Sequence, residues 1–271
     1  MPRIQENNLP EFKLNKPPIV ESWVSFDFEP KPDKVEWDGK LANELAESLR
    51  GRFPKKEYVW QSEIRVVQAD KGQLPVPQSL EHRLNIVRMR NEQDTRIFQI
   101  ADDRIVVNQV KGQDAWPGFE ALLNDALELV DRYSAVFQPA GIRLATLHDV
   151  DIVEIPAPKG VEVEMDEFLT IVKELPQLPF GLIQGFFSAY VTVSPLDGEP
   201  LQISTQLIPS PPDGHVLRLR LDWEKRCGKV DFNTAESIRA GLLDSHRFVV
   251  ECFRSAFTAD KGLKLFDPVE S

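Results

Sequence analysis

Residues 143–156 read RLATLHDVDIVEIP and bring His148, Asp149 and Asp151 close together in the sequence. A histidine beside two carboxylates is the composition of a metal site, or of a general base with its orienting acid. The stretch also alternates apolar and polar residues, which is typical of a β-strand whose successive side chains point to opposite faces. His148 would then point away from both aspartates. We therefore interpret the stretch as the opening strand of a second structural half rather than as a catalytic cluster.

The residues before this stretch predict a first half made of strand, helix, several strands and a long helix. Alternation and helical periodicity place these elements over 17–30, 38–53, 57–68, 83–90, 95–101, 104–111 and 114–137. Asp102-Asp103, between the last two strands, predicts a tight hairpin connection.

The residues from 143 onward repeat this order. They predict a strand, a short helix, three strands and a long helix over 143–156, 165–175, 185–195, 200–209, 215–224 and 232–257. Asn233 and Glu236 resemble a capping box at the start of the long helix.

These patterns predict an α+β protein of two pseudo-repeats, each with the order strand, helix, antiparallel strands and long helix. The helices should pack on one face of the antiparallel sheet. The predicted organisation is a flexible N-terminal arm over 1–16, a first half over 17–140 and a second half over 141–271, with one continuous domain as the alternative. The element order resembles a duplicated TATA-binding-protein-like fold, and a fold alone carries no function.

Composition narrows the partners and the compartment. A net charge of −11 disfavours binding to nucleic acid, because the basic residues are not gathered into one run. No segment has the apolar length of a membrane span, and the N-terminus lacks the apolar core of a signal peptide. Cys227 and Cys252 form no CxxC pair and fit a reducing compartment. We expect a cytoplasmic protein without membrane contact.

Two stretches resemble a sporadically distributed family of uncharacterised prokaryotic proteins of about this length. They are PPIVE at 17–21 and the block at 99–156, and the matching positions include Pro18, Arg104, Trp116 and Arg143. The family usually carries an arginine-tyrosine-isoleucine-asparagine core in the strand after its long helix, where this chain has LHDVD at 147–151. The resemblance implies an architecture and a patchy occurrence that fits accessory or defence roles, and it implies no activity.

Motifs for nucleophilic catalysis, phosphate binding and structural zinc are missing from the sequence. The sequence therefore leans against an enzyme and indicates no catalytic residue, no cofactor and no metal site. Gly181 and Gly185 lead into a strand, which disfavours a phosphate cradle. His246 lies on the apolar side of the last helix, as a core or boundary histidine does.

The leading functional interpretation is a non-enzymatic interaction protein. Glu21, Trp23 and Asp27 on the first strand and Asp149 and Asp151 on its counterpart would form an acidic, partly aromatic face away from the helices. Such a face could dock a protein partner or a second copy of the chain, or it could simply be solvated. The alternatives are a TATA-binding-protein-like nucleic-acid binder and, less favoured, a cation-dependent hydrolase that uses Asp149 and Asp151.

Overall fold

The computed structural model describes residues 14–30, 37, 39–67, 76–112, 116–158, 163–171, 187–211, 215–227 and 234–268. For residues 62–67 and 76–83 it describes the backbone only. The elements are, in chain order, β1 (Ile19–Glu29), α1 (Gly39–Ser48), β2 (Lys55–Val67), β3 (Val76–Arg90), β4 (Arg96–Ile100), β5 (Arg104–Val110), α2 (Phe119–Phe137), β6 (Gly141–Pro156), η1 (Met165–Glu167), β7 (Phe187–Val193), β8 (Pro200–Ile208), β9 (Val216–Cys227), α3 (Ala235–Ala256) and η2 (Leu263–Phe266).

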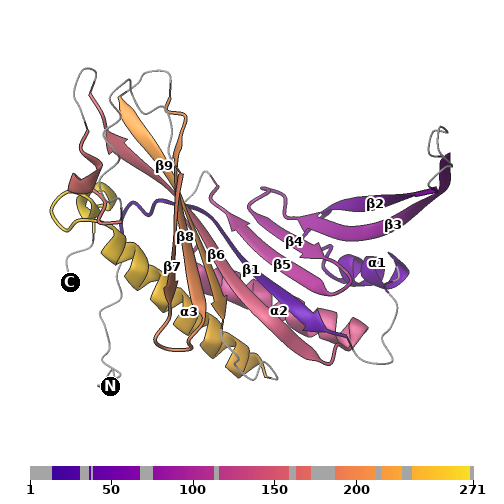
Figure 1. The fold of residues 1–271 in the computed structure, drawn as a ribbon. Coiled ribbons are helices and arrows are strands. Elements are labelled where there is room, and N and C mark those ends of the chain that lie inside the picture. The colour runs from indigo at the N-terminus through magenta and orange to yellow at the C-terminus, as the bar shows by residue number, and fades with distance from the viewer. Residues whose placement is uncertain are drawn as a thin grey trace. The chain divides into compact units, whose positions relative to one another are not determined.

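The strands form a nine-stranded antiparallel sheet in the order β2-β3-β4-β5-β1-β6-β9-β8-β7 (Figure 1). This confirms the predicted α+β class with an antiparallel sheet. The two-fold internal repeat remains a prediction. The chain divides into two compact units, one made of residues 21–147 and 226–242 and the other of residues 1–20, 148–225 and 243–271. We call them the β1–β5 unit and the β7–β9 unit.

In the β1–β5 unit the helices cover one face of the strands. Alternation along β1 turns Val24, Phe26 and Phe28 toward the helices, and all three are buried. Phe28 stacks on Tyr133 of α2, with ring centroids 4.4 Å apart. The residues of opposite parity point to the other side, which we call the open face of this unit.

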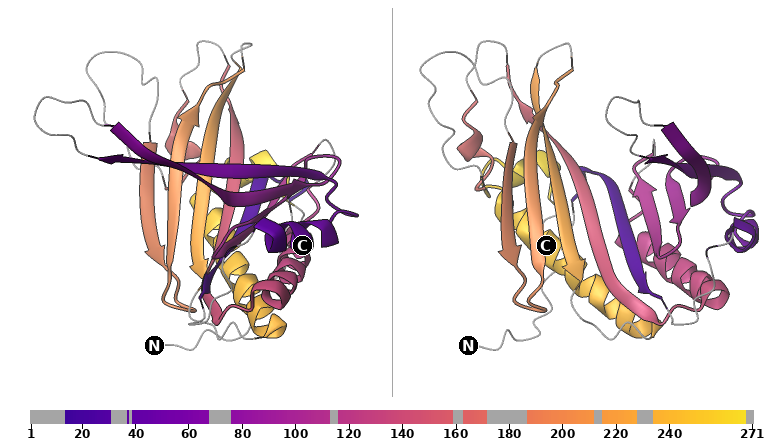
Figure 2. Two further views of the ribbon diagram at one scale, coloured as in Figure 1. Left: turned by 90° about the vertical axis from the view of Figure 1, so that its right-hand side faces the viewer. Right: turned by 45° about the vertical axis from the view of Figure 1, so that its right-hand side comes forward.

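In the β7–β9 unit the second part of α3 runs across one face of the strands (Figure 2). Trp223 of β9 lies on this face, and its ring centroid is 6.0 Å from that of Phe253 in α3. The core of this unit continues into η2, where Phe266 packs against Phe253 and Phe257. The side of the strands away from α3 is the open face of this unit.

The N-terminal residues that the structure describes are tied to the C-terminal end of the chain. The backbone of Asn15 and Lys16 donates to the carbonyls of Asp267 and Phe266, each at 3.0 Å. The remainder of the predicted arm, residues 1–13, lies outside the described residues.

Two of the predicted helices differ most from the structure. α1 ends at Ser48, and the chain then turns through Gly51 so that Leu49 and Phe53 are both buried without a continuous helix. Phe53 packs on Phe98 of β4, with ring centroids 4.0 Å apart. The four-residue spacing of Leu49 and Phe53 therefore reflects the burial of both side chains and not a continuous helix. Over residues 165–171, the predicted short helix is replaced by the single turn η1 and by backbone pairing of Leu169 with Phe257. Residues 172–175 lie outside the described residues, as do Asn233, Gly181 and Gly185.

The predicted hairpin at Asp102-Asp103 is confirmed. The N–H of Ala101 donates to the carbonyl of Arg104 at 2.8 Å, which closes the turn between β4 and β5. Tyr133 of α2 adds a second tie, because its hydroxyl donates to the carbonyl of Asp102 at 2.6 Å.

Candidate protein interface

Glu21, Trp23 and Asp27 lie on the open face of the β1–β5 unit, opposite to the core residues of β1. Asn108 of β5 donates an amide hydrogen to Glu21 at 2.6 Å. Arg104 donates from two nitrogens to the carboxylate of Asp27, the second at 3.1 Å. The hydrogen bond to Asp27 raises the pKa of Arg104. Both carboxylates are thus already engaged within the sheet.

This open face carries charges of both signs. Its register brings Glu57 of β2 opposite Arg88 of β3, and their side chains form an ion pair at 3.3 Å. Lys55 pairs with Asp94 at 2.7 Å. Three strands thus present cations beside the acidic residues, and the expectation of an acidic sheet face does not hold for this unit.

Asp149 and Asp151 are buried, with 4% and 5% of their surface exposed. The indole nitrogen of Trp223 donates to Oδ2 of Asp151 at 2.8 Å. Because Trp223 packs on α3, Asp151 points to the helix-covered side of the β7–β9 unit. The expectation that both aspartates lie on a sheet face away from the helices is therefore wrong. Burial, and then the nearby charge of Asp149, raise the pKa of Asp151 to about 8, although the hydrogen bond from Trp223 lowers it in part.

His148 points away from the two aspartates, as the strand alternation predicts. Its Nε2 lies 3.4 Å from Oδ1 of Asp222, which Arg220 also contacts on the same strand. Burial alone would raise the pKa of Asp222, but the hydrogen bond with His148 and the contact with Arg220 lower it to about 2. The result is a compact set of compensated charges on the open face of this unit.

Among the described residues of the β7–β9 unit, the large apolar side chains with the highest exposed fractions lie on β7, at the end of the sheet. Phe187, Val191 and Val193 expose 67%, 68% and 60% of their surface. The register sets Phe187 opposite Gln206 and Val191 opposite Gln202, whereas Tyr190 lies opposite Ile203 on the helix side. Phe187, Val191 and Val193 therefore form a row on the open face, which we call the β7 row.

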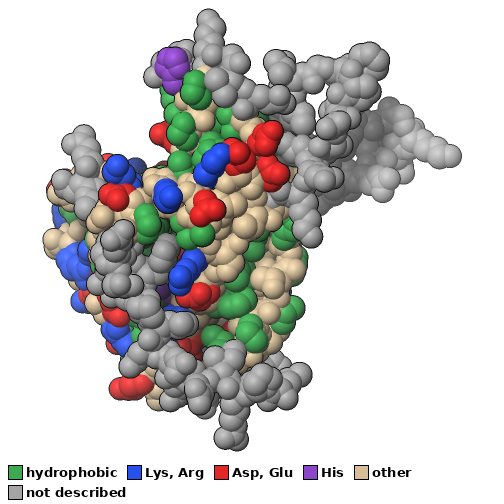
Figure 3. Space-filling view, turned by 90° about the vertical axis from the view of Figure 1, so that its left-hand side faces the viewer, with side chains coloured by type: hydrophobic (Ala, Val, Ile, Leu, Met, Phe, Trp, Pro, Cys, Tyr) green, Lys and Arg blue, Asp and Glu red, His purple; other side chains and the backbone are tan. Residues whose placement is uncertain are grey.

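β7 and β8 carry no charged residue, although 28% of the chain is charged. Figure 3 looks at the molecule from the left of Figure 1, and its lower right border is formed by hydrophobic and uncharged groups. An uncharged edge strand rich in β-branched and aromatic residues is adhesive, because its outer backbone groups can pair with another strand. β7 falls within the predicted strand 185–195, for which the sequence predicts no functional role. The absence of charge over two successive strands was the available signal.

The turn after β7 is held in place by a buried cation. Lys225 of β9 is 0% exposed, and its Nζ lies 2.7 Å from Oδ2 of Asp197 in the turn. The N–H of Ser194 donates to the carbonyl of Glu199 at 3.0 Å, and Gly198 supplies the positive φ of 74° that the turn requires. β7 is thus presented as a fixed strand.

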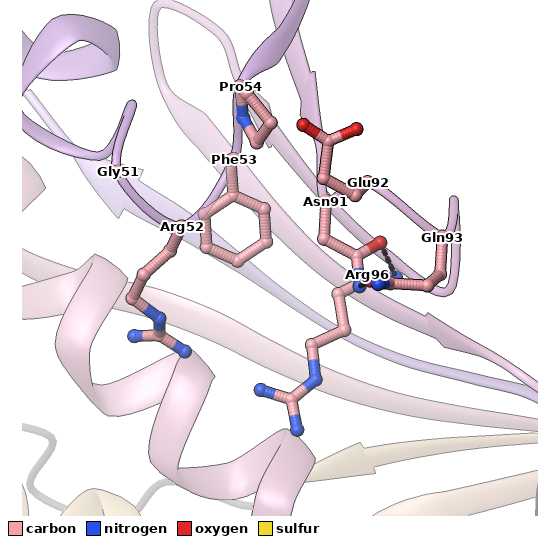
Figure 4. Close-up of a pocket in the computed structure, with 8 residues that line it drawn as sticks. All are labelled: Gly51, Arg52, Phe53, Pro54, Asn91, Glu92, Gln93 and Arg96. Atoms are coloured by element: carbon pink, nitrogen blue, oxygen red, sulfur yellow. Dashed lines mark hydrogen bonds between the residues drawn. The ribbon is translucent and has the colours of Figure 1, made fainter.

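A pocket of about 360 Å³ in the β1–β5 unit is a weaker candidate. Figure 4 shows that Arg52 and Arg96 extend from its wall toward α2. There both guanidinium groups bind Asp125, and Arg52 also contacts Glu128. The two cations are therefore compensated by α2 rather than directed at a ligand.

The residues of the family motif have structural positions. The carbonyl of Pro18, which is buried, accepts a hydrogen bond from the N–H of Ile152 at 3.0 Å. Arg104 binds Asp27 as described above. Trp116 is half-buried and Arg143 is exposed.

Comparison with protein-family models and with curated proteins found no match to this chain. The resemblance to the sporadically distributed family therefore remains a prediction. Among the described residues, no helix combines the length and apolarity of a membrane span, and no three His, Cys, Asp or Glu side chains gather as metal ligands would.

Proposed function

We propose that this chain is a non-enzymatic interaction protein that accepts an extended strand of a protein partner at its β7 edge. The observation that carries the proposal is the β7 row, a set of large apolar side chains on an uncharged strand at the end of the sheet. Strand addition to a sheet edge gains affinity from main-chain hydrogen bonds and specificity from alternate side chains. Contiguous exposed apolar surface of this kind marks interaction sites.

The two alternative functions gain no support from the geometry. A cation-dependent hydrolase would need ionised carboxylates. The carboxyl of Asp151 is instead buried, accepts a hydrogen bond from Trp223 and has a raised pKa. A nucleic-acid binder would need free cations, whereas Lys55, Arg88 and Arg104 each pair with an acid.

Some expectations stay part of the proposal. Glu21, Trp23 and Asp27 remain a predicted second contact set on the β1–β5 unit. A cytoplasmic location and an accessory or defence role remain predictions as well.

Quantitative affinity capture tests the proposed function. The wild-type chain and the Val191→Lys variant serve as baits in extract from the source cells, and captured proteins are measured by mass spectrometry. A lysine at position 191 places a charge in the middle of the β7 row. The amounts of a set of proteins captured by the wild type should therefore be at least tenfold lower with the variant.

The matched control is Trp60→Lys. Trp60 is 59% exposed and lies on β2, the strand at the other end of the sheet. The substitution makes the same change of charge and also removes an exposed apolar side chain, away from β7. Equal capture by wild type and Val191→Lys, or equal losses in both variants, would contradict the proposal.

A further inference from the structure

We infer that the strand accepted by β7 is β7 of a second copy of this chain, paired antiparallel about a two-fold axis through Tyr190. The inference rests on the proposed function of the β7 edge and names its partner. Four features of β7 support it: the direction of its outward backbone groups, the match of its side chains to themselves, the unsatisfied hydroxyl of Ser188, and its lack of charge.

The backbone of β7 fixes which residues can bond outward. Ser194 donates to the carbonyl of Glu199 across the hairpin, so Ser194 belongs to the set that bonds toward β8. Because this set alternates along an antiparallel pair, Ser188, Tyr190 and Thr192 also bond toward β8. The N–H and C=O groups of the alternate residues, from Phe187 to Val193, then point to the outer edge. Within the described residues β7 pairs with β8 alone, so no other described strand occupies that edge.

A two-fold axis at Tyr190 pairs only residues of the same set. Phe187 of one copy lies opposite Val193 of the other, and Ala189 lies opposite Val191, so each outward N–H meets an outward C=O. An axis midway between two residues would set outward groups against inward ones. The register centred on Tyr190 is also the one that uses the whole of β7.

The side chains of β7 match in this register. On the open face the aromatic ring of Phe187 meets the β-branched Val193, and the small Ala189 meets the larger Val191. On the helix side Tyr190 meets its own symmetry mate. Aromatic, aromatic–β-branched and hydroxyl pairs are the favourable cross-strand combinations.

Ser188 provides a separate sign of a missing neighbour. Its Oγ is buried and has no hydrogen-bond partner among the described residues. In the proposed pair Ser188 lies directly opposite the hydroxyl of Thr192 of the other copy. The pairing would therefore satisfy a polar atom that the described part of the single chain leaves unsatisfied.

Charge favours the same conclusion. A chain of net charge −11 repels its own copies unless the contact is uncharged. β7 and β8 hold no charged residue, so the first two strands on each side of the axis are neutral. By contrast β2, at the other end of the sheet, includes Lys55, Lys56 and Glu57. Charges on an edge strand are a common protection against pairing.

Cysteine cross-linking tests the register, in a Cys252→Ser background that removes the half-buried native thiol. At the axis the two residues 190 form a non-hydrogen-bonded pair with Cα atoms about 4.5 Å apart, within the range for a disulfide. Tyr190→Cys should therefore give a cross-linked dimer under mild oxidation. Thr192→Cys is the matched control, because its two copies would lie about 14 Å apart along the strands.

A mixture of two single variants keeps Tyr190 intact. Ser188→Cys and Thr192→Cys should cross-link to each other when mixed and should not cross-link alone. Failure of both the Tyr190→Cys and the mixed cross-links, or equal cross-linking of Thr192→Cys alone, would overturn the proposed register.

Sedimentation equilibrium measures the association itself. We expect the wild type and Trp60→Lys to dimerise and Val191→Lys to associate at least tenfold more weakly. A wild type that is monomeric at every soluble concentration would overturn the inference. If its Val191→Lys variant nevertheless loses captured proteins, the partner is another protein and the proposed function stands. If Val191→Lys captures the same proteins as the wild type and also has the same apparent molecular mass in sedimentation equilibrium, both proposals are contradicted.

Discussion

Asp151 is an acid in a position that strands usually give to apolar side chains. It lies on the helix side of β6 beside Trp223, and its pKa is about 8 rather than the ordinary 3.8. Between these two pH values the folded chain holds a proton that the unfolded chain has released. Stability therefore falls as the pH rises from about 4 to 8, because the native state binds more protons than the unfolded state.

We predict that Asp151→Asn reduces this pH dependence. The amide can still accept the Trp223 hydrogen bond but cannot ionise. Relative to the variant, the wild type should lose on the order of 3 kcal/mol of unfolding free energy between pH 5 and pH 8. Urea denaturation at the two pH values measures this difference. The control is Asp166→Asn on the exposed turn η1, and a wild type that matches Asp151→Asn at both pH values would contradict the assignment.

The orientation of the aspartates could not be read from RLATLHDVDIVEIP. Val150 and Ile152 are apolar at one parity, and Leu147 and Val153 are apolar at the other. Alternation separated His148 from Asp149 and Asp151 correctly but could not tell which set faces the helices. That choice depends on Trp223, a residue distant in sequence whose indole N–H compensates the buried carboxyl.

At the scale of elements, the hydroxyl of Tyr133 connects α2 to the turn between β4 and β5. We predict that Tyr133→Phe lowers the unfolding free energy by about 1 kcal/mol, the usual loss for one hydrogen bond in a well-packed site. The ring contact with Phe28 remains, so the loss reports on the bond to Asp102.

Equilibrium denaturation in urea checks this prediction. Tyr58→Phe is the control, since its hydroxyl bonds Asn43 at an exposed position and should contribute less. A Tyr133→Phe variant as stable as the wild type, or a loss no larger than that in Tyr58→Phe, would contradict this prediction.

The sequence predicted the long, strongly periodic elements well, because one face of each is buried. The predicted helix over 114–137 is α2, and the clean alternation over 215–224 is β9. Short elements failed, as at 165–171 of the predicted helix 165–175, because the backbone of Phe168 and Thr170 pairs with the end of α3 and the residues after it. The β7 row was missed because both faces of an edge strand can be apolar without any periodic signal.

At the scale of the whole molecule, pairing through β7 links stability to concentration. We predict that the melting temperature of the wild type rises by about 1 °C for each tenfold increase in protein concentration, while dimer forms in that range. Differential scanning calorimetry at several concentrations measures this. Val191→Lys should melt at the same temperature at every concentration, and a wild type with an equally constant melting temperature would count against dimer formation.

The unequal ends of the sheet also set the size of the assembly. In the proposed pair both β7 strands lie in the interior, and the outward ends are the charged β2 strands. A third copy then finds no adhesive edge, so the assembly closes at two chains instead of growing into a fibre. The charges of β2 thus have a use that no single chain reveals: they limit stoichiometry.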